Sequence, residues 1–310
     1  MRAGRARQGG VALITALVVV VICSMIASDM LWSTFLDQRR TATVLQGTQA
    51  REYARGAEDW VGHLLRMDRE ETETDHLEQQ WAEEITALPL DDHGTLSGRL
   101  LDQQGLFNLN NLVQEDGTIH QESYEQFQRL LMLLGFDPDL VNPVVDWIDP
   151  DQEPMMPLGA EDGEYLRRDP AHRTADQPMQ STSELRMIEG FDDEILEALK
   201  PYVTALPTME HTPINVNTAP PLVLATLADN MSERDGEFLA EGQADGGYRA
   251  VDQFHEIAER NIPVEISVTT DFFKLEGRVE VGDASVSMYS LLARDEMGGT
   301  MTIRRTYGTR

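Results

Sequence analysis

Carboxylates gather in one proline-rich stretch near the middle of the chain, WIDPDQEPMMPLGAEDGEYL, where they could act together on a metal ion. They are Asp149, Asp151, Glu153, Glu161, Asp162 and Glu164. Pro150, Pro154 and Pro157 forbid a regular helix through this stretch. Oxygen donors at alternate positions of an irregular loop suit calcium, which takes roughly six to eight oxygen ligands at ~2.3–2.6 Å. The residues therefore predict an acidic loop over 149–165 that a divalent cation would order.

Two interpretations of this loop remain open from spacing alone. It binds calcium, or it is a solvated acidic loop in an acidic protein. It is not an EF-hand, because Pro154 stands where that loop needs glycine and Ala160 where it needs a bidentate glutamate.

The sequence does not contain the residue patterns of a zinc site or of the common catalytic sites. Cys23 is the one cysteine, and the seven histidines are scattered without the spacing of a zinc site. The sequence has no Gly-x-Ser-x-Gly turn and no phosphate-cradling glycine loop. Among 54 Asp and Glu residues, a catalytic pair is indistinguishable from chance. We therefore predict no catalytic residue and no enzyme.

The chain that carries this loop begins with a basic leader and a long apolar segment. Arg2, Arg5 and Arg7 precede residues 11–28, which carry no charge. At about 1.5 Å per residue this segment just reaches across a bilayer core, which needs roughly 17–25 residues. The basic leader marks the N-terminal side as cytoplasmic. We therefore predict a single-pass inner-membrane protein with a periplasmic C-terminal domain.

The junction between Gly10 and Val11 bears on how the chain is processed. A secretory signal has a shorter apolar core and a small-x-small cleavage site, which residues 29–32 do not supply. An uncleaved signal anchor fits the apolar segment as well. The Arg-Gln-Gly-Gly junction looks like the leader of a prepilin. Such a leader is cut on the cytoplasmic side, here after Gly10, so that Val11 becomes the N-terminus and the apolar helix is kept.

The charge composition of the chain limits which partners the protein can bind. In 310 residues, 25 Lys and Arg stand against 54 Asp and Glu, for a net charge of −29. This field repels nucleic acid and anionic lipid headgroups and attracts cations. An acidic surface for solubility, or for a salty habitat, is the simpler explanation of most of the excess. Cys23 has no partner for an intrachain disulfide, so the exported domain depends on its core, and a metal could add to it.

Apolar residues at steps of three and four continue beyond the apolar segment and predict one long helix over 11–67. A shorter helix is predicted next, over 77–88 before Pro89, and residues 98–112 are predicted to be extended. Short helices are then expected near 124–134, 142–148, 183–188, 193–199 and from 220. For the second of these, Asn142 is predicted as the cap and Pro143 in the first turn.

Near the C-terminus the spacing of apolar residues changes from helical steps to alternation. Residues 273–281 alternate, Gly282 and Asp283 turn the chain, residues 286–293 run back, and Met301 and Ile303 suggest a last strand. A sheet divided in the sequence by a helical block predicts an insertion within one fold.

A weak internal repeat links residues 106–111, LFNLNN, with residues 213–218, PINVNT. Asparagine side chains bond local backbone, so each copy predicts an entry into a helix. The second copy also resembles the opening of a helix-hairpin-helix module of competence proteins, which gives an alternative function as a DNA-binding membrane receptor. Residues 220–230 carry no basic side chain to meet phosphate, so we expect no nucleic-acid partner.

Several motifs in order resemble the minor pseudopilin K family of bacterial type II secretion systems, the general secretion pathway protein K, over nearly the full chain. The motifs are QGGVALI at 8–14, FNLNNL at 107–112, VDWID at 145–149, GAED at 159–162 with Tyr165, SEL at 183–185 and INVNTA at 214–219.

This resemblance implies a pilin-like α+β fold, with a long N-terminal helix on an antiparallel sheet and a large inserted α-helical domain. The expected division is a leader at 1–10, a transmembrane half-helix at 11–28, helix and first strands at 29–112, the insertion at 113–265 and returning strands at 266–310. It also implies calcium in the acidic loop. By position we carry the ligands to Asp149, Asp151, Glu153, Glu161 and Asp162, with Asp146 and Asp176 as weaker additions.

The resemblance further implies cleavage and N-methylation by prepilin peptidase, and a place at the pseudopilus tip with other minor pseudopilins on the inner-membrane secretion platform. Most pilins carry glutamate at the fifth residue after the cut, where it neutralises the terminal amine of the subunit ahead. Here that residue is Thr15. A tip subunit has no subunit ahead and needs no such charge, which costs much in lipid. A good lipid-facing residue is the other explanation of Thr15.

Overall fold

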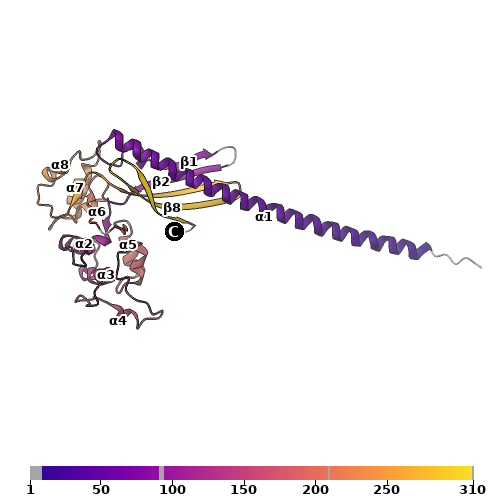
Figure 1. The fold of residues 1–310 in the computed structure, drawn as a ribbon, viewed down its shortest axis with the longest axis horizontal. Coiled ribbons are helices and arrows are strands. Elements are labelled where there is room, and N and C mark those ends of the chain that lie inside the picture. Colours follow the sequence, from indigo (N-terminus) through magenta and orange to yellow (C-terminus); the bar gives the residue numbers. More distant parts are fainter. Residues whose placement is uncertain (1–8, 91–93, 209, 309–310) are drawn as a thin grey trace, which may run out of the picture.

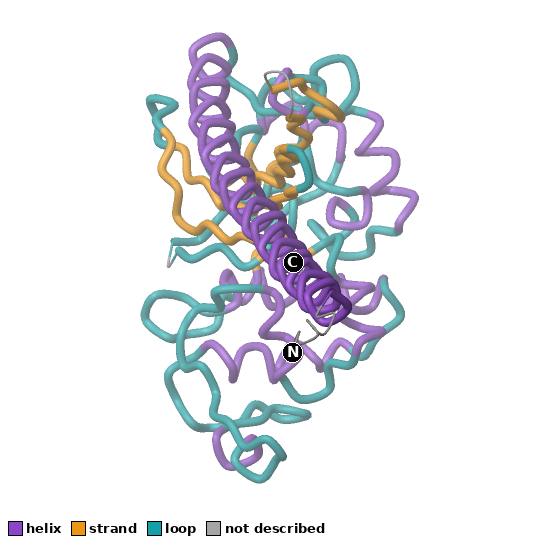
Figure 2. The backbone as a smooth tube through the Cα atoms, turned by 90° about the vertical axis from the view of Figure 1, so that its right-hand side faces the viewer, coloured by secondary structure: helices purple, strands orange, loops and turns teal. Residues whose placement is uncertain are grey.

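One long helix, α1 (Gly9–Glu71), lies along one side of the folded part and extends far beyond it (Figure 1). The computed structural model describes residues 9–90, 94–208 and 210–308, so most of the leader expected at 1–10 lies outside the described residues. The N-terminal half of α1 projects free of the rest of the protein, and the C-terminal half lies on a sheet (Figures 1 and 2). The long helix predicted over 11–67 is confirmed.

The sheet under α1 has five strands in the order β1-β2-β7-β8-β9, and each neighbouring pair is antiparallel. The strands are β1 (Ile85–Leu90), β2 (Gly94–Asp102), β7 (Phe272–Val281), β8 (Ala284–Arg294) and β9 (Thr300–Tyr307). Strand β2 pairs with β7 although the whole helical region lies between them in the sequence. The sheet predicted at the C-terminus is therefore present, and it takes its first two strands from before the insertion.

Small and apolar side chains let α1 approach the sheet. Ala50, Ala54 and Leu65 are fully buried or nearly so on the sheet-facing side of α1. Trp81 packs edge-on against Phe273 of β7, with ring centroids 5.2 Å apart. Burying each large apolar side chain contributes about 1.5–3 kcal/mol. This core fixes where the free half of the helix begins.

The helical region lies between Asp102 at the end of β2 and Phe272 at the start of β7, near the C-terminal end of α1 (Figure 1). Its helices are α2 (Gln121–Leu133), α3 (Val141–Ile148), α4 (Asp162–Tyr165), α5 (Asp193–Leu199), α6 (Pro221–Leu224), α7 (Glu233–Glu241) and α8 (Val251–Ala258). Shorter 3-10 turns span Leu109–Leu112, Pro138–Leu140 and Thr182–Met187.

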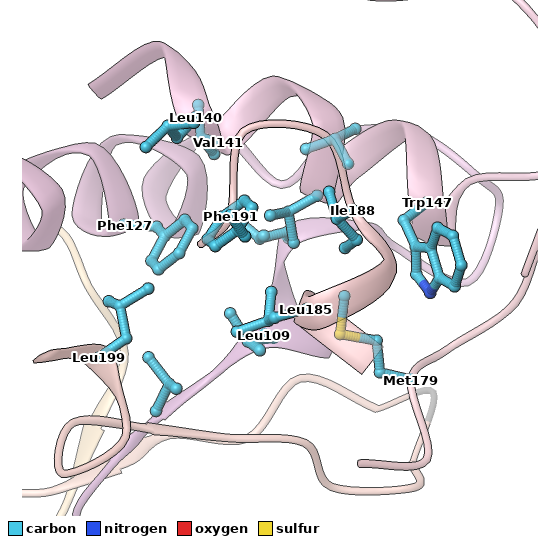
Figure 3. Packing of buried hydrophobic residues seen from close by; sticks show 14 of the residues in the cluster. Leu109, Phe127, Leu140, Val141, Trp147, Met179, Leu185, Ile188, Phe191 and Leu199 are labelled. Carbon is cyan, nitrogen blue, oxygen red and sulfur yellow. The ribbon is translucent and has the colours of Figure 1, made fainter. Parts of the chain in front are cut away.

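Two separate cores divide the helical region into modules. The first gathers α2, α3, α5 and the turns between them around residues such as Leu109, Phe127, Trp147, Leu185 and Leu199 (Figure 3). The second is built from α6, α7 and α8 around side chains that include Val216, Tyr248 and Phe254.

Each module contains one copy of the asparagine repeat, at a short pair of parallel strands. Strands β3 (Phe107–Asn108) and β4 (Val203–Thr204) pair in parallel in the first module, and β5 (Ile214–Asn215) and β6 (Ile266–Ser267) pair likewise in the second.

The side chains of the repeat make matching bonds in both copies. The amide of Asn110 exchanges two hydrogen bonds with the backbone of Met179, and Asn217 does the same with Tyr248. The repeat in the sequence is thus a repeat in structure.

Two of the predicted local structures are wrong. Residues 77–88 do not form a helix, since a 3-10 turn at Gln80–Ala82 is followed by strand β1. Asn142 is not a cap, because α3 already begins at Val141 and the Asn142 amide instead donates to the Pro157 carbonyl at 2.8 Å.

Two further predictions hold in part. The extended stretch predicted over 98–112 is correct in β2, to Asp102, and in β3, at 107–108, but residues 109–112 form a 3-10 turn. Residues 183–188 form a 3-10 turn, Thr182–Met187, where a helix was expected.

Candidate functional site

The acidic loop emerges from the end of a buried helix. Every residue of α3 is buried, and Asp149 caps its C-terminus before the prolines turn the chain away. Inside α3, the fully buried carboxylate of Asp146 accepts the backbone amide of Met155 at 3.2 Å from both oxygens. Gly159 comes so close to Asp146 and to the Met155 backbone that a side chain there would collide with both. The protein core therefore shapes the loop.

Three of the predicted ligands meet in this loop. Asp149, Asp151 and Glu161 each offer a carboxylate oxygen, and these oxygens lie within 4.8 Å of one another. Asp149 and Glu161 are each 6% exposed, whereas Asp151 faces solvent. The chain bends tightly here, because Asp149 accepts the amide of Asp151 and Asp151 accepts that of Glu153 at 2.7 Å.

The electrostatics of the cluster are those of crowded carboxylates. Burial, with the charges of Asp146 and Asp149, raises the pKa of Glu161 to about 8. Burial and the charge of Asp151 raise the pKa of Asp149 to about 6. Both oxygens of Glu161 are buried and accept no hydrogen bond from any residue that the structure describes. A buried carboxylate without a partner is costly, and a bound cation would remove that cost.

The remaining predicted ligands lie around the cluster and outside it. The carboxylate of Asp162 accepts from the amide and hydroxyl of Thr174, each at 3.1 Å, and pairs with Arg173 at 3.0 Å. Glu153 is exposed and is not among the three carboxylates that meet. Asp176 is exposed, with a left-handed backbone at φ 48°, and receives the Gln152 amide at 3.3 Å.

Space for an ion and its waters is present beside the loop. A cavity of about 520 Å³ lies there, lined by Gln152, Pro154, Gly159, Ala160, Glu161, Gly163, Glu164, Arg167 and Glu189. Oxygen donors on a bent loop, a buried unpartnered carboxylate and room for water together fit a hard cation such as calcium.

The apolar half of α1 forms the second functional surface. It is the one helix in the described residues that is long and apolar enough to cross a membrane, and none of its most apolar window is buried in the protein. Val11 is 69% exposed at its start. The hydroxyl of Thr15 donates to the carbonyls of Val11 and Ala12, at 3.1 and 3.0 Å, so it needs no partner outside the helix.

A buried polar junction was not foreseen from the sequence. Arg294 of β8 donates to the carboxylate of Asp75, which follows α1, and lies 3.6 Å from Asp68 of α1. Asp102 at the end of β2 accepts from the Asn215 amide at 2.8 Å and from the Thr270 hydroxyl at 2.7 Å. Burial raises the pKa of both Asp68, to about 7, and Asp102. The junction ties the end of α1, the sheet and the second module together.

Of the residues in this junction, only Asn215 could be recognised from the sequence. The repeated Asn-x-Asn motif marks Asn215, but the spacing of Asp75, Asp102 and Arg294 along the chain gives no sign that they meet.

Comparisons with known proteins agree with this architecture. The family model for the first domain of type II secretion system protein K matches residues 105–208, and the model for protein K matches residues 214–262. These two matches fall on the two helical modules.

Whole-chain relatives extend the match. The type II secretion system protein K of Pseudomonas aeruginosa is 33% identical over 98% of this chain and 94% of its own length. That of Aeromonas hydrophila is 31% identical over 97% of this chain and 98% of its own. Among solved structures, a chain of the GspK-GspI-GspJ complex from the enterotoxigenic Escherichia coli type 2 secretion system superposes with a TM-score of 0.76. It is 27% identical and covers 87% of this chain and 100% of its own. The chain therefore belongs to the type II secretion system protein K family, the minor pseudopilins K.

Proposed function

We propose that this protein is the subunit at the tip of the periplasmic pseudopilus, where it helps to start the assembly and caps it. The observation that carries the proposal is the division of α1 into a free apolar half and a half fixed to the sheet. The free half packs beside the helices of other subunits. The helical region lies at the other end of α1 and would block addition of a subunit above it (Figure 1).

The orientation follows from the sequence at the start of α1. Arginines before the apolar segment hold the N-terminus in the cytoplasm, and the folded part then lies in the periplasm. Prepilin peptidase cuts after Gly10 and methylates Val11, and the inner-membrane secretion platform receives the helix. Thr15 supports the tip position, because its hydroxyl is already bonded within the helix and carries no charge for a subunit ahead.

Its partners are other minor pseudopilins, of the I and J types. The protein K relative from enterotoxigenic Escherichia coli was solved in a GspK-GspI-GspJ complex, which supports the same assembly for this chain. Val44 and Leu45 lie on α1 between the apolar segment and the part packed on the sheet, and are 68% and 64% exposed. They are available to a neighbouring helix.

Co-purification tests this assembly. The full chain in detergent should bind the I and J pseudopilins from the same secretion system. Val44→Glu with Leu45→Glu should weaken that complex by about tenfold or more, because burying a charge at a helix contact is costly. Met297→Glu, at a residue 83% exposed in the β8–β9 turn, is the matched control and should leave the complex intact. Equal binding by all three proteins would contradict the helix contact.

A catalytic role receives no support from the site geometry. Ser123, His211 and Glu265 are connected in the order of a hydrolase triad, with Ser123 Oγ 3.2 Å from His211 Nε2. However, Ser123 is 1% exposed, and His120 contacts the other side of its hydroxyl at 2.9 Å. The hydroxyl is therefore buried and shared between two histidines, unlike the exposed nucleophile of a hydrolase, and we assign the protein a structural role.

The DNA-binding alternative is not supported. In the second asparagine motif, Asn215 and Asn217 use their amides on Asp102 and Tyr248 inside the protein. The helix that follows, α6, offers no basic residue to phosphate.

The acidic loop binds calcium in this proposal, through Asp149, Asp151 and Glu161. Glu153, Asp162, Asp146 and Asp176 are the further candidates for the remaining ligand positions. The buried and unpartnered Glu161 carboxylate is the main support. Calcium would supply charge neutralisation and order the loop, and it takes no part in a reaction.

Thermal melting with and without calcium tests this site. Calcium in large excess should raise the melting temperature of the full chain by about 5 °C or more, because it binds only the folded loop. Glu161→Gln should lose most of that rise. Glu194→Gln, at an exposed position in α5, should keep it. An equal melting temperature of the unmutated protein with and without calcium would contradict the calcium site.

A further inference from the structure

Two histidines far apart in the sequence lie against each other at the junction of the helical modules. His120 precedes α2, and His211 lies in the segment between the modules. Their ring centroids are 4.5 Å apart. His120 Nδ1 lies 2.9 Å and His211 Nε2 3.2 Å from the same atom, the Oγ of Ser123. One nitrogen of each ring is therefore directed at one point.

The other nitrogen of each ring faces a carboxylate. His211 Nδ1 lies 3.1 Å from Oε2 of Glu265, just before β6, and His120 Nε2 lies 3.7 Å from Oε2 of Glu122 in α2. Histidines that bind a metal usually hold their second ring nitrogen against a carboxylate or carbonyl, which fixes the tautomer and turns the lone pair toward the metal.

The hydrogens of this cluster do not satisfy both rings at once. The Ser123 hydroxyl has a single hydrogen but faces one nitrogen of each ring. The Ser123 amide donates to His120 Nδ1 at 3.3 Å, which keeps a lone pair on that nitrogen. With the His211 Nδ1 hydrogen directed at Glu265, His211 Nε2 also carries a lone pair, and the hydroxyl can donate to only one of the two nitrogens.

Two imidazole lone pairs are therefore directed at one place beside the Ser123 hydroxyl. Imidazole lone pairs suit zinc, copper and nickel, and these ions compete with protons for them.

We propose that His120 Nδ1 and His211 Nε2 bind one divalent transition-metal ion of the zinc class, with the Ser123 hydroxyl as third donor. Glu122 and Glu265 orient the two rings from outside. The ion joins three segments, namely the start of α2, the segment between the modules and the residue before β6. It is independent of the calcium loop, which offers only oxygen donors and suits hard cations.

Zinc titration by calorimetry tests the proposal on the full chain in detergent, with calcium saturating so that the acidic loop is occupied. The unmutated protein should bind one zinc ion. His120→Gln and His211→Gln should each raise the Kd at least about tenfold. Glu265→Gln should raise it about 10–100-fold while leaving both ligands in place. His63→Gln, at an exposed histidine of α1, is the matched control and should bind as the unmutated protein does.

The variants also separate a metal site from a structural contact. Glu265 has a side chain that is 66% exposed, so its substitution should leave the fold intact, which circular dichroism in a chelator would verify. Glu161→Gln should bind zinc normally even if it loses calcium. Absence of zinc binding by the unmutated protein would overturn the proposal. So would unchanged affinity in His120→Gln and His211→Gln.

Discussion

Glu58 is the carboxylate that fixes α1 to the sheet. It is 4% exposed and accepts from the hydroxyls of Ser290 and Thr302 and from the guanidinium of Arg305. Burial alone would raise the pKa of Glu58, but these donors outweigh it and lower the pKa from 4.5 to about 2. The folded state therefore prefers the ionised form more strongly than the unfolded chain does.

The sign of the pH dependence follows from that shift. The contribution of Glu58 is fully present above pH 4.5 and is lost as the pH falls through about 2. We expect Glu58→Gln to lower the free energy of unfolding at pH 7 by about 3 kcal/mol, and the difference to vanish near pH 2. Urea melts of the full chain at several pH values measure this. Glu52→Gln, at an exposed position of α1, should show no such trend, and a constant difference for Glu58→Gln would contradict the account.

The residue types of the acidic loop were predictable, but the set that meets was not. Alternating carboxylates between prolines indicated a cation, and Asp149, Asp151 and Glu161 do come together. Asp162 turns toward Thr174 and Arg173, contacts that depend on how a distant segment folds back. His120 and His211 show the same limit, since no spacing rule links residues that only the tertiary fold brings side by side.

At the scale of elements, periodicity predicted what was long and regular. Apolar residues at steps of three and four predicted α1, and the alternation of apolar residues predicted β7, β8 and β9. It was misleading over 77–88, where Leu77, Trp81, Ile85 and Leu88 imitate a helical face. Trp81 is buried there as an anchor against Phe273, and Ile85 already belongs to an edge strand. Short apolar stretches of this kind fit either period, and tertiary packing decides between them.

The buried junction around Arg294 joins the end of α1, the sheet and the second module, so its loss should destabilise all three. Arg294→Met leaves Asp75 buried without its cation, which we expect to cost about 3–5 kcal/mol of unfolding free energy. Arg278→Met, at a residue of β7 whose side chain is 57% exposed, is the control and should cost less than about 1 kcal/mol. Denaturant melts compare the two. Equal losses would mean that the junction adds no stability of its own.

At the scale of the whole molecule, the interrupted sheet predicted an insertion correctly. The sequence did not show that the insertion has two cores, because the short helices of both modules have the same apolar pattern. The repeated asparagine motif was the signal, and its meaning became clear only when each copy was seen to pair in parallel with a later strand. Net charge of −29 fits a molecule that collects cations and avoids nucleic acid.

A role at the pseudopilus tip requires that α1 stay attached as one helix from lipid to sheet. The most direct measurement is mass spectrometry of the N-terminal peptide of the protein taken from membranes of cells that contain prepilin peptidase. We expect a peptide that begins at Val11 with one methyl group on its amine, recovered in the membrane fraction. A soluble periplasmic protein whose first residue lies after Ser28 would contradict the account.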